Sequence, residues 1–182
     1  MKTEIRIAGL GGQGVVLAGE ILGRAAMYEG RNVVQTQSYG AEARGSIARS
    51  EVIISDDKIN FPAIRKSDVL IAMNQEAVDK YMKELRDNGI LIFDSTYVKE
   101  DPKTNAKIFK VSATENAERT FGTKVYANIV MIGALTRITG VVSQGSVEKA
   151  IENTLPQKVI ATNLQAYQKG QELIRQNHRS PF

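Results

Sequence analysis

A glycine-rich turn near the start of the chain has the residue types and spacing of a phosphate-binding loop. Gly9, Gly11 and Gly14 follow the pattern G-x-G-x-x-G. Polar and apolar residues alternate over Lys2–Ala8, which predicts a strand, and apolar residues share one helical face over Val15–Glu29. A strand–turn–helix unit points free backbone N–H groups and the positive end of a helix dipole at whatever lies above the turn. The sequence therefore predicts an anion site at this turn.

The second strand decides which phosphate ligand suits the turn. A dinucleotide site places an acidic residue at the end of that strand, where it binds the ribose hydroxyls. The expected second strand, Asn32–Gln37, ends without Asp or Glu. Arg31 would suit a 2′-phosphate, but it stands at the start of the strand, which is the wrong end. A nicotinamide- or flavin-binding dehydrogenase thus remains an alternative without its main support, and a tight turn that binds nothing is a second alternative.

Composition excludes several kinds of chemistry. The 182 residues contain no cysteine, so the chain has no disulfide, no thiolate nucleophile, no Cys-ligated zinc and no cysteine-held iron–sulfur cluster. The single histidine, His178, lies in a polar tail, which disfavours histidine acid–base catalysis and multi-histidine metal sites. The net charge of +4 is small and dispersed, which does not favour nucleic acid as a partner.

Location follows from the same composition. No apolar run reaches the length of a membrane span, and a strand begins almost at residue 1, where a signal peptide would carry an apolar helix. We therefore expect a cytoplasmic protein without a membrane partner.

Strands and helices alternate along the rest of the chain, which indicates one α/β domain over residues 1–182. We expect a Rossmann-like three-layer arrangement, with a mainly parallel sheet flanked by helices. Glu4 and Arg6 in the first strand predict that one face of the sheet is incompletely covered there. Further strands are expected at Ile47–Ser55, Asp68–Met73, Ile90–Phe93 and Ile108–Val111. Further helices are expected at Gln75–Arg86, Glu115–Thr120, Val125–Ile138, Ser146–Leu155 and Val159–Arg175.

The segment Ser38–Ser46 follows the second strand and reads as a loop, because glycines bracket a Glu and an Arg beside a Tyr. Adjacent parallel strands end on the same side of a sheet, so we expect this loop near the glycine turn. Arg44 is suited to bidentate contact with a phosphate. Glu42 either serves a partner surface or forms an ion pair with Arg44 or Arg49.

Three stretches together resemble the gamma subunit of 2-oxoacid:ferredoxin oxidoreductases. They are the turn Gly-Leu-Gly-Gly-Gln-Gly at 9–14, the run Ser-Tyr-Gly-Ala-Glu-Ala-Arg-Gly-Ser-Ile-Ala-Arg-Ser-Glu-Val at 38–52, and Ser-Asp-Val-Leu-Ile-Ala-Met at 67–73. The similarity runs over nearly the whole chain, and the 2-oxoglutarate branch is the most similar. Pyruvate, branched-chain 2-oxoacid and indolepyruvate branches share the same motifs.

The resemblance implies an enzyme subunit that is inactive alone and contributes no catalytic residue. Enzymes of this family convert a 2-oxoacid and coenzyme A into an acyl-CoA and carbon dioxide. Electrons pass to ferredoxin or another low-potential acceptor. Thiamine diphosphate and the iron–sulfur clusters belong to alpha, beta and ferredoxin-like delta partner subunits. When isolated, such a subunit can pair with itself as a homodimer. A purely structural role in assembly is the remaining alternative.

The resemblance also implies a binding role for residues at the two loops: holding coenzyme A and closing over the thiamine site. The residues expected to contact its pyrophosphate are Gly11, Gly12, Gln13, Gly14 and Val15. Arg44, Gly45 and Ser46 are expected at a second phosphate or the pantetheine arm. Asn74 and Asn128 are expected at the pantetheine amides, although Asn74 is equally suited to cap a helix. Tyr39, Gly40 and Glu42 are expected to face the subunit that carries thiamine diphosphate.

Overall fold

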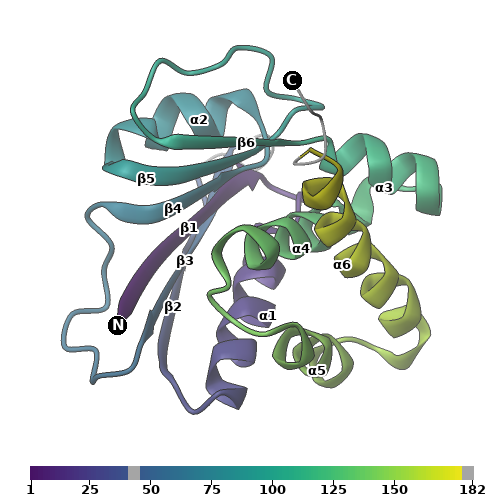
Figure 1. Ribbon diagram of the computed structural model, residues 1–182, viewed down its shortest axis with the longest axis horizontal. Helices are drawn as coiled ribbons and strands as arrows, with labels where there is room; N and C mark the ends of the chain where they lie inside the picture. The colour runs from purple at the N-terminus through teal and green to yellow at the C-terminus, as the bar shows by residue number, and fades with distance from the viewer. Residues whose placement is uncertain (41–45, 178–182) are drawn as a thin grey trace.

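A six-stranded sheet forms the centre of the molecule, with helices on both faces (Figure 1). The computed structural model describes residues 1–40 and 46–177. The strand order across the sheet is β2-β3-β1-β4-β5-β6. The strands are β1 (Lys2–Leu10), β2 (Asn32–Ser38), β3 (Ile47–Ser55), β4 (Ser67–Ala72), β5 (Leu85–Asp94) and β6 (Lys107–Val111).

Strand β3 lies between the first two strands and runs antiparallel to both of them. The expectation that the second strand borders the first is therefore wrong, and only the pairs β1–β4, β4–β5 and β5–β6 are parallel. The described ends of the loop after β2 do lie near the glycine turn, as expected. The reason, however, is an antiparallel hairpin and not a pair of adjacent parallel strands. Ile47 at the start of β3 pairs with Leu10 at the end of β1, so the β2–β3 hairpin brings its tip to the glycine turn.

The helices form two unequal layers over the sheet. Figure 1 shows α2 on one face and α1, α4, α5 and α6 on the other, which confirms the predicted three-layer α/β arrangement. The helices are α1 (Val15–Tyr28), α2 (Gln75–Tyr81), α3 (Ala113–Phe121), α4 (Ala127–Thr139), α5 (Gln144–Thr154) and α6 (Gln157–Asn177), with 3-10 turns η1 (Met82–Glu84) and η2 (Lys124–Tyr126).

Helix α2 is shorter than the apolar spacing predicts. It ends at Tyr81, and after η1 the chain enters β5 at Leu85 instead of remaining helical to Arg86. Leu85 pairs with Ser67 of β4, and Asn88 takes the left-handed conformation with φ 62° within the strand. Sheet pairing thus overrides a helical pattern that continues for one more turn.

The multi-helix face holds the larger apolar core, and two glycines bring its helices into close contact. A Cβ at Gly170 of α6 would lie 1.9 Å from the carbonyl oxygen of Val130 in α4. A Cβ at Gly133 of α4 would lie 2.1 Å from the carbonyl oxygen of Tyr167. Backbone therefore packs against backbone at this crossing, and α4 is held rigidly over the sheet.

The opposite face contains a buried charge cluster, so the expectation of an incompletely covered face is wrong at Arg6, whereas Glu4 lines an open cavity of about 610 Å³. Arg6 is 1 % exposed and lies 5.0 Å below the ring of Tyr81 in α2. Its guanidinium contacts carboxylate oxygens of Glu51 at 2.7 Å and Glu84 at 2.5 Å, and donates to the carbonyl of Ile64 at 3.1 Å. Two ion pairs explain why a charge is tolerated there, although Nη1 of Arg6 makes no hydrogen bond.

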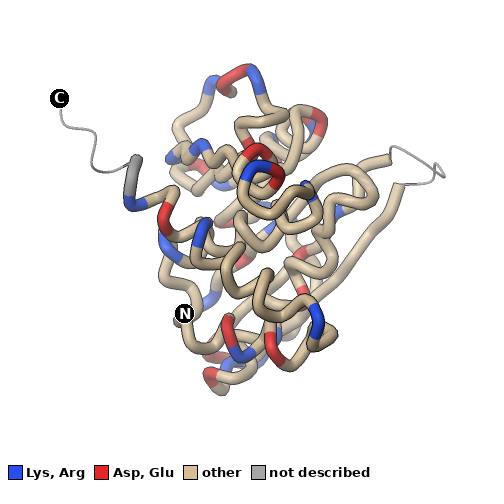
Figure 2. Tube along the Cα trace, turned by 90° about the vertical axis from the view of Figure 1, so that its right-hand side faces the viewer, with Lys and Arg blue, Asp and Glu red and all other residues tan. Residues whose placement is uncertain are grey.

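Charged residues of both signs are interspersed along the described trace (Figure 2). Among residues 1–40 and 46–177, we find no helix with the length and apolar character needed to span a bilayer.

Candidate functional site: a cavity at the carboxyl ends of the strands

The glycine turn between β1 and α1 has a backbone that favours glycine at two positions. Gly12 has φ 92° and Gly14 has φ 71°, both in the left-handed region. The N–H of Gln13 donates to the carbonyl of Leu10 at 3.0 Å, and that of Gly11 donates to the carbonyl of Ser46 at 3.1 Å. The turn is therefore closed on itself and joined to the start of β3.

Three other N–H groups of the turn remain available for a ligand. Within the part of the chain that the structure describes, the N–H groups of Gly12, Gly14 and Val15 donate to no acceptor. Helix α1 has no acidic residue in its first turn and no side-chain cap. The positive end of its dipole is thus uncompensated, which favours an anion in front of the turn.

The side chain of Gln13 joins the ends of β1 and β4. Its Oε1 accepts from the N–H of Leu10 at 2.7 Å and from Nδ2 of Asn74 at 3.1 Å, while its Nε2 donates to the carbonyl of Met73 at 3.3 Å. Asn74 in turn accepts from the N–H of Ala77 at 2.8 Å, so the expected helix cap is confirmed. Both side chains hold the turn against β4.

Asn128 holds the other side of the turn. It is 4 % exposed, and its Nδ2 donates to the carbonyl of Gly14 at 3.0 Å. A Cβ at Gly14 would lie 2.4 Å from that same Nδ2. The glycine therefore provides the space in which Asn128, at the start of α4, reaches the backbone.

A cavity of about 290 Å³ opens beside the turn. Its polar wall includes the turn and the ammonium of Lys124, and its apolar wall is formed by Met73, Val125 and Ala127. The complete lining is Gly12, Gln13, Met73, Tyr97, Thr114, Lys124, Val125 and Ala127. The cavity lies at the carboxyl ends of β1, β4 and β5, the edge at which open α/β sheets bind ligands.

Lys124 is the described side-chain cation at this cavity. Its Nζ donates to the hydroxyl of Tyr97 at 3.2 Å. That hydrogen bond and the nearby negative charge of Glu118 raise the pKa of Lys124 above its usual 10.5. The lysine is therefore positively charged at neutral pH.

A buried carboxylate fixes the wall that Tyr97 and Thr114 form. Asp94, at the end of β5, is fully buried and accepts from the N–H of Thr96 and of Thr114, each at 3.0 Å. It also accepts from the Thr114 hydroxyl at 2.5 Å. Three donors satisfy the charge and hold the start of α3 against the strand end.

The loop after β2 is described only at its two ends. Tyr39 is 63 % exposed, and a Cβ at Gly40 would lie 2.3 Å from that of Ser46, so the two ends are in close contact. The predicted site residues Glu42, Arg44 and Gly45 lie outside the described residues, as does His178. The structure thus brings together the glycine turn, Ser46, Asn74 and Asn128.

Sequence reasoning missed Lys124 and Tyr97. Both lie in short irregular segments, Tyr97 three residues after β5 and Lys124 in the 3-10 turn before α4. Their position after a buried strand and before a buried helix is a weak signal on its own. Within residues 1–40 and 46–177, no group of three or more acidic or histidine side chains is arranged to hold a metal ion.

The comparisons with known proteins agree with this architecture. Residues 4–173 match the family model described as pyruvate ferredoxin/flavodoxin oxidoreductase. The 2-oxoglutarate synthase subunit KorC of Methanothermobacter marburgensis is 47% identical over 98% of this chain and 100% of its own length. The crystal structure of a keto/oxoacid ferredoxin oxidoreductase gamma subunit from Geobacter sulfurreducens has a TM-score of 0.86 and 41% identity, over 96% of this chain and 99% of that one.

A more distant solved structure shares the fold. The 2-oxoglutarate:ferredoxin oxidoreductase of Magnetococcus marinus superposes with a TM-score of 0.87 at 23% identity, over 96% of this chain and 31% of that one. The chain belongs to the pyruvate ferredoxin/flavodoxin oxidoreductase family of oxidoreductase subunits. Within that family, the predicted resemblance to the gamma subunit, and to its 2-oxoglutarate branch, is confirmed.

Proposed function

We propose that this chain positions coenzyme A within a 2-oxoacid:ferredoxin oxidoreductase, with 2-oxoglutarate as the 2-oxoacid. The observation that carries the proposal is the set of unbonded N–H groups of Gly12, Gly14 and Val15 at an uncompensated helix start beside a cavity. Such groups bind the phosphates of a ligand without any acidic ribose clamp. Coenzyme A carries a pyrophosphate, and its 3′-phosphate would be repelled by such a clamp.

Relatives of the chain support this choice of substrate and thiol. The curated relatives with 45–47% identity are 2-oxoglutarate synthase subunits. The Magnetococcus marinus enzyme, which shares the fold, was solved with 2-oxoglutarate, coenzyme A and succinyl-CoA bound. This chain has no cysteine, so any cysteine-ligated iron–sulfur cluster of the complex must belong to partner subunits.

The work of this chain is binding and positioning. The N–H groups of Gly12, Gly14 and Val15 hold the pyrophosphate, while the N–H of Gln13 closes the turn. Asn74 and Asn128 fix the turn from two sides, and we assign them to positioning because both are at least 93 % buried. Gly11 shapes the turn through its bond to Ser46.

The hairpin loop completes the assignment. Arg44, Gly45 and Ser46 bind a second phosphate or the pantetheine arm, and Tyr39, Gly40 and Glu42 face the thiamine-bearing subunit. The exposed ring of Tyr39 suits such an interface, because aromatic residues are enriched in interface cores. The partners are alpha, beta and ferredoxin-like delta subunits, in a cytoplasmic complex in which residues 1–182 form one gamma-type domain.

A charge placed at Gly12 tests the proposal. Gly12 is exposed and a Cβ there meets nothing within 4 Å, and Asp and Asn both tolerate positive φ. Gly12→Asp places a negative charge in front of the helix start, whereas Gly12→Asn adds the same bulk without the charge. In the assembled complex, we expect Gly12→Asp to raise the KM for coenzyme A roughly tenfold over Gly12→Asn, a difference of about 1.4 kcal/mol.

The KM for 2-oxoglutarate serves as the internal control and is expected to be equal in both variants. Equal coenzyme A constants for the two variants would instead favour a purely structural assembly subunit. Calorimetry with NADH and NADPH addresses the dehydrogenase alternative, since micromolar binding of either would contradict the coenzyme A assignment. The isolated chain is expected to show no oxidation of any 2-oxoacid.

A further inference from the structure

The cavity beside the glycine turn combines an anion-binding wall with an apolar wall. Gly12 and Lys124 provide N–H groups and a positive charge, while Met73, Val125 and Ala127 provide hydrocarbon surface. Val125 is 64 % exposed, which is unusual for a valine in the segment leading into a buried helix. Its side chain is therefore available to a ligand.

Lys124 is positioned for a ligand anion that comes from outside this chain. Among the described residues, its Nζ contacts the hydroxyl and the ring of Tyr97, but no carboxylate lies within ion-pair distance. Tyr97 is anchored at the end of β5, where its N–H donates to the carbonyl of Asp94 at 3.1 Å. The ammonium is therefore held at the rim without an ion pair among the described residues, although the charge of Glu118 acts on it from beyond ion-pair distance.

The cavity also limits how much of a ligand it can enclose. Its volume of about 290 Å³ lies at the lower end of the roughly 300–1,000 Å³ of small-molecule sites, so it encloses one part of coenzyme A. That part must present an anion directly beside a compact alkyl group. In coenzyme A this occurs where the pyrophosphate joins the pantoyl unit, which carries two methyl groups on one carbon. The 3′-phosphate, by contrast, is attached to a polar ribose.

We propose that this cavity binds the junction between the pyrophosphate and the dimethyl-bearing pantoyl unit of coenzyme A. Lys124 contacts the pyrophosphate opposite the glycine turn, and Val125 packs against the methyl groups. Tyr97 is a positioning residue that orients Lys124. This inference rests on the proposed function. It adds which part of coenzyme A the cavity binds and names Lys124 and Val125 as the residues that recognise that part.

Three thiol substrates resolve the assignment in the assembled complex. Coenzyme A has both phosphate groups, dephospho-coenzyme A lacks the 3′-phosphate, and pantetheine lacks all phosphate but keeps the pantoyl unit. We expect Lys124→Ala to raise the KM for the first two roughly 10- to 100-fold and to leave that for pantetheine unchanged. Lys124→Arg is expected to restore most of the affinity, and Lys103→Ala, in the exposed segment between β5 and β6, to have no effect.

Val125→Thr tests the apolar contact, because it replaces one methyl with a hydroxyl of similar size. We expect it to raise the KM for all three thiols about three- to tenfold, pantetheine included. Circular dichroism and assembly of each variant complex confirm that folding is retained.

Each other pattern overturns the inference. If Lys124→Ala weakens coenzyme A but not dephospho-coenzyme A, Lys124 meets the 3′-phosphate. If it weakens neither, the lysine contacts no phosphate. If Val125→Thr spares pantetheine, the apolar wall does not hold the pantoyl unit. These outcomes are distinguishable from a failure of the proposed function. That failure would appear as equal KM values for coenzyme A in the Gly12→Asp and Gly12→Asn variants.

Discussion

The two faces of the sheet are buried by different means. On the face covered by α1, α4 and α6, apolar side chains fill the core and Gly170 packs directly on the α4 backbone. On the face covered by α2, a buried guanidinium is surrounded by carboxylates and an aromatic ring. The α2 face also has an apolar cluster, which includes Leu70, Val78 and Phe93. The first face therefore depends on apolar packing alone, whereas the second combines apolar packing with charge pairing.

This difference relates to the number of elements that cover each face. Several helices share the apolar face, whereas the seven residues of α2 cover the other with help from the chain around Ile64. Arg6 reaches Glu51 in β3, Glu84 in η1 and the carbonyl of Ile64, so one long side chain links three segments. A paired charged residue thus joins segments on a face that has few helices, beside a smaller apolar cluster.

Breaking the charge cluster is expected to have the largest effect. Arg6→Met keeps most of the side-chain volume but removes the closest cation of the buried carboxylate of Glu51, which retains only the longer contact with Arg49 at 3.9 Å. We expect the free energy of unfolding to fall by about 3–5 kcal/mol in urea denaturation. The double variant Arg6→Met, Glu51→Met removes both charges and is expected to be more stable than Arg6→Met alone. A double variant that is less stable than the single one would contradict the role of charge pairing.

The apolar face is tested by adding one methyl group at the helix crossing. Gly170→Ala drives a Cβ into the carbonyl of Val130, and such overpacking costs about 1–3 kcal/mol. Gly145→Ala in α5 is the matched control, because a Cβ there meets nothing within 4 Å, and it is expected to stabilise by about 0.4–1 kcal/mol. Equal melting temperatures for the two variants would show that the contact between α4 and α6 accommodates the added methyl group without loss of stability.

The smallest expected effect concerns Glu29, an exposed carboxylate at the end of α1. Burial raises the pKa of Glu29, but hydrogen bonds from Ser143 and Ser146 and the charge of Arg31 outweigh it and hold that pKa below 4.5. Glu29 therefore stabilises the fold above pH 4.5, and this stabilisation is lost as pH falls through its lowered folded-state pKa. Glu29→Gln is expected to cost at most about 0.5 kcal/mol at pH 7 and to flatten the pH dependence of the melting temperature in that acid range.

Most elements were predictable because their apolar patterns are local. The β3 strand matches its predicted bounds, and α1, α5 and α6 differ from theirs by a few residues. The pattern failed where long-range pairing dominates. The helical spacing through Leu85 gave no sign that this residue pairs with Ser67, and nothing in β2 or β3 alone reveals that β3 is inserted antiparallel beside β1.

The candidate site was predictable for its turn and less so for its surroundings. The glycines and Asn74 belong to recognisable local motifs, and the turn and the helix cap form as predicted, while their contact with a ligand stays a prediction. Arg6 suggested an open face, because its partners Glu51 and Glu84 lie 45 and 78 residues away in the chain. Lys124 gave only a weak signal, since a lysine before a helix is ordinary until the fold places it at the same cavity as Gly12.

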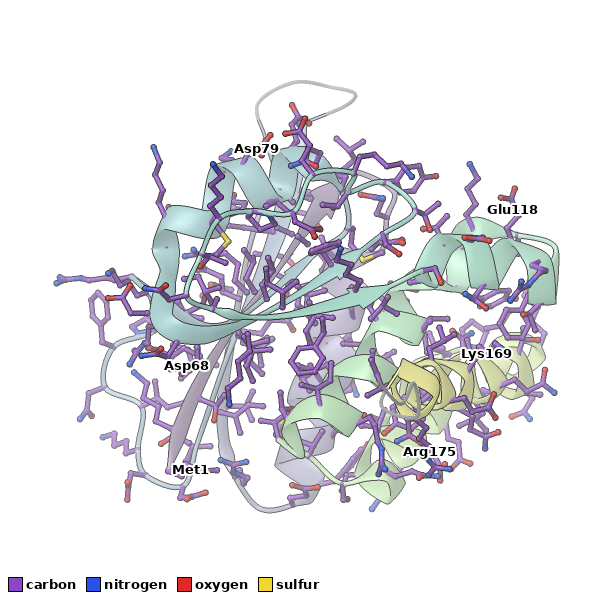
Figure 3. All side chains as sticks on the ribbon, turned by 45° about the horizontal axis from the view of Figure 1, so that its top comes forward. Met1, Asp68, Asp79, Glu118, Lys169 and Arg175 are labelled. Atoms are coloured by element: carbon purple, nitrogen blue, oxygen red, sulfur yellow. The ribbon has the colours of Figure 1, made fainter. Side chains whose placement is uncertain are left out.

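The Asn128–Gly14 contact has a consequence for the order in which the protein matures. The two residues are 114 positions apart, and the contact closes the turn from the side of α4. Figure 3 shows Glu118 of α3, upstream of this contact, on one side of the molecule, and Met1 and Asp68, at the amino ends of β1 and β4, on the other side. During translation, β1 and α1 leave the ribosome long before α4 does. The nascent chain consequently has no finished cavity until α4 has been synthesised, so fragments released early would lack the wall that α4 contributes.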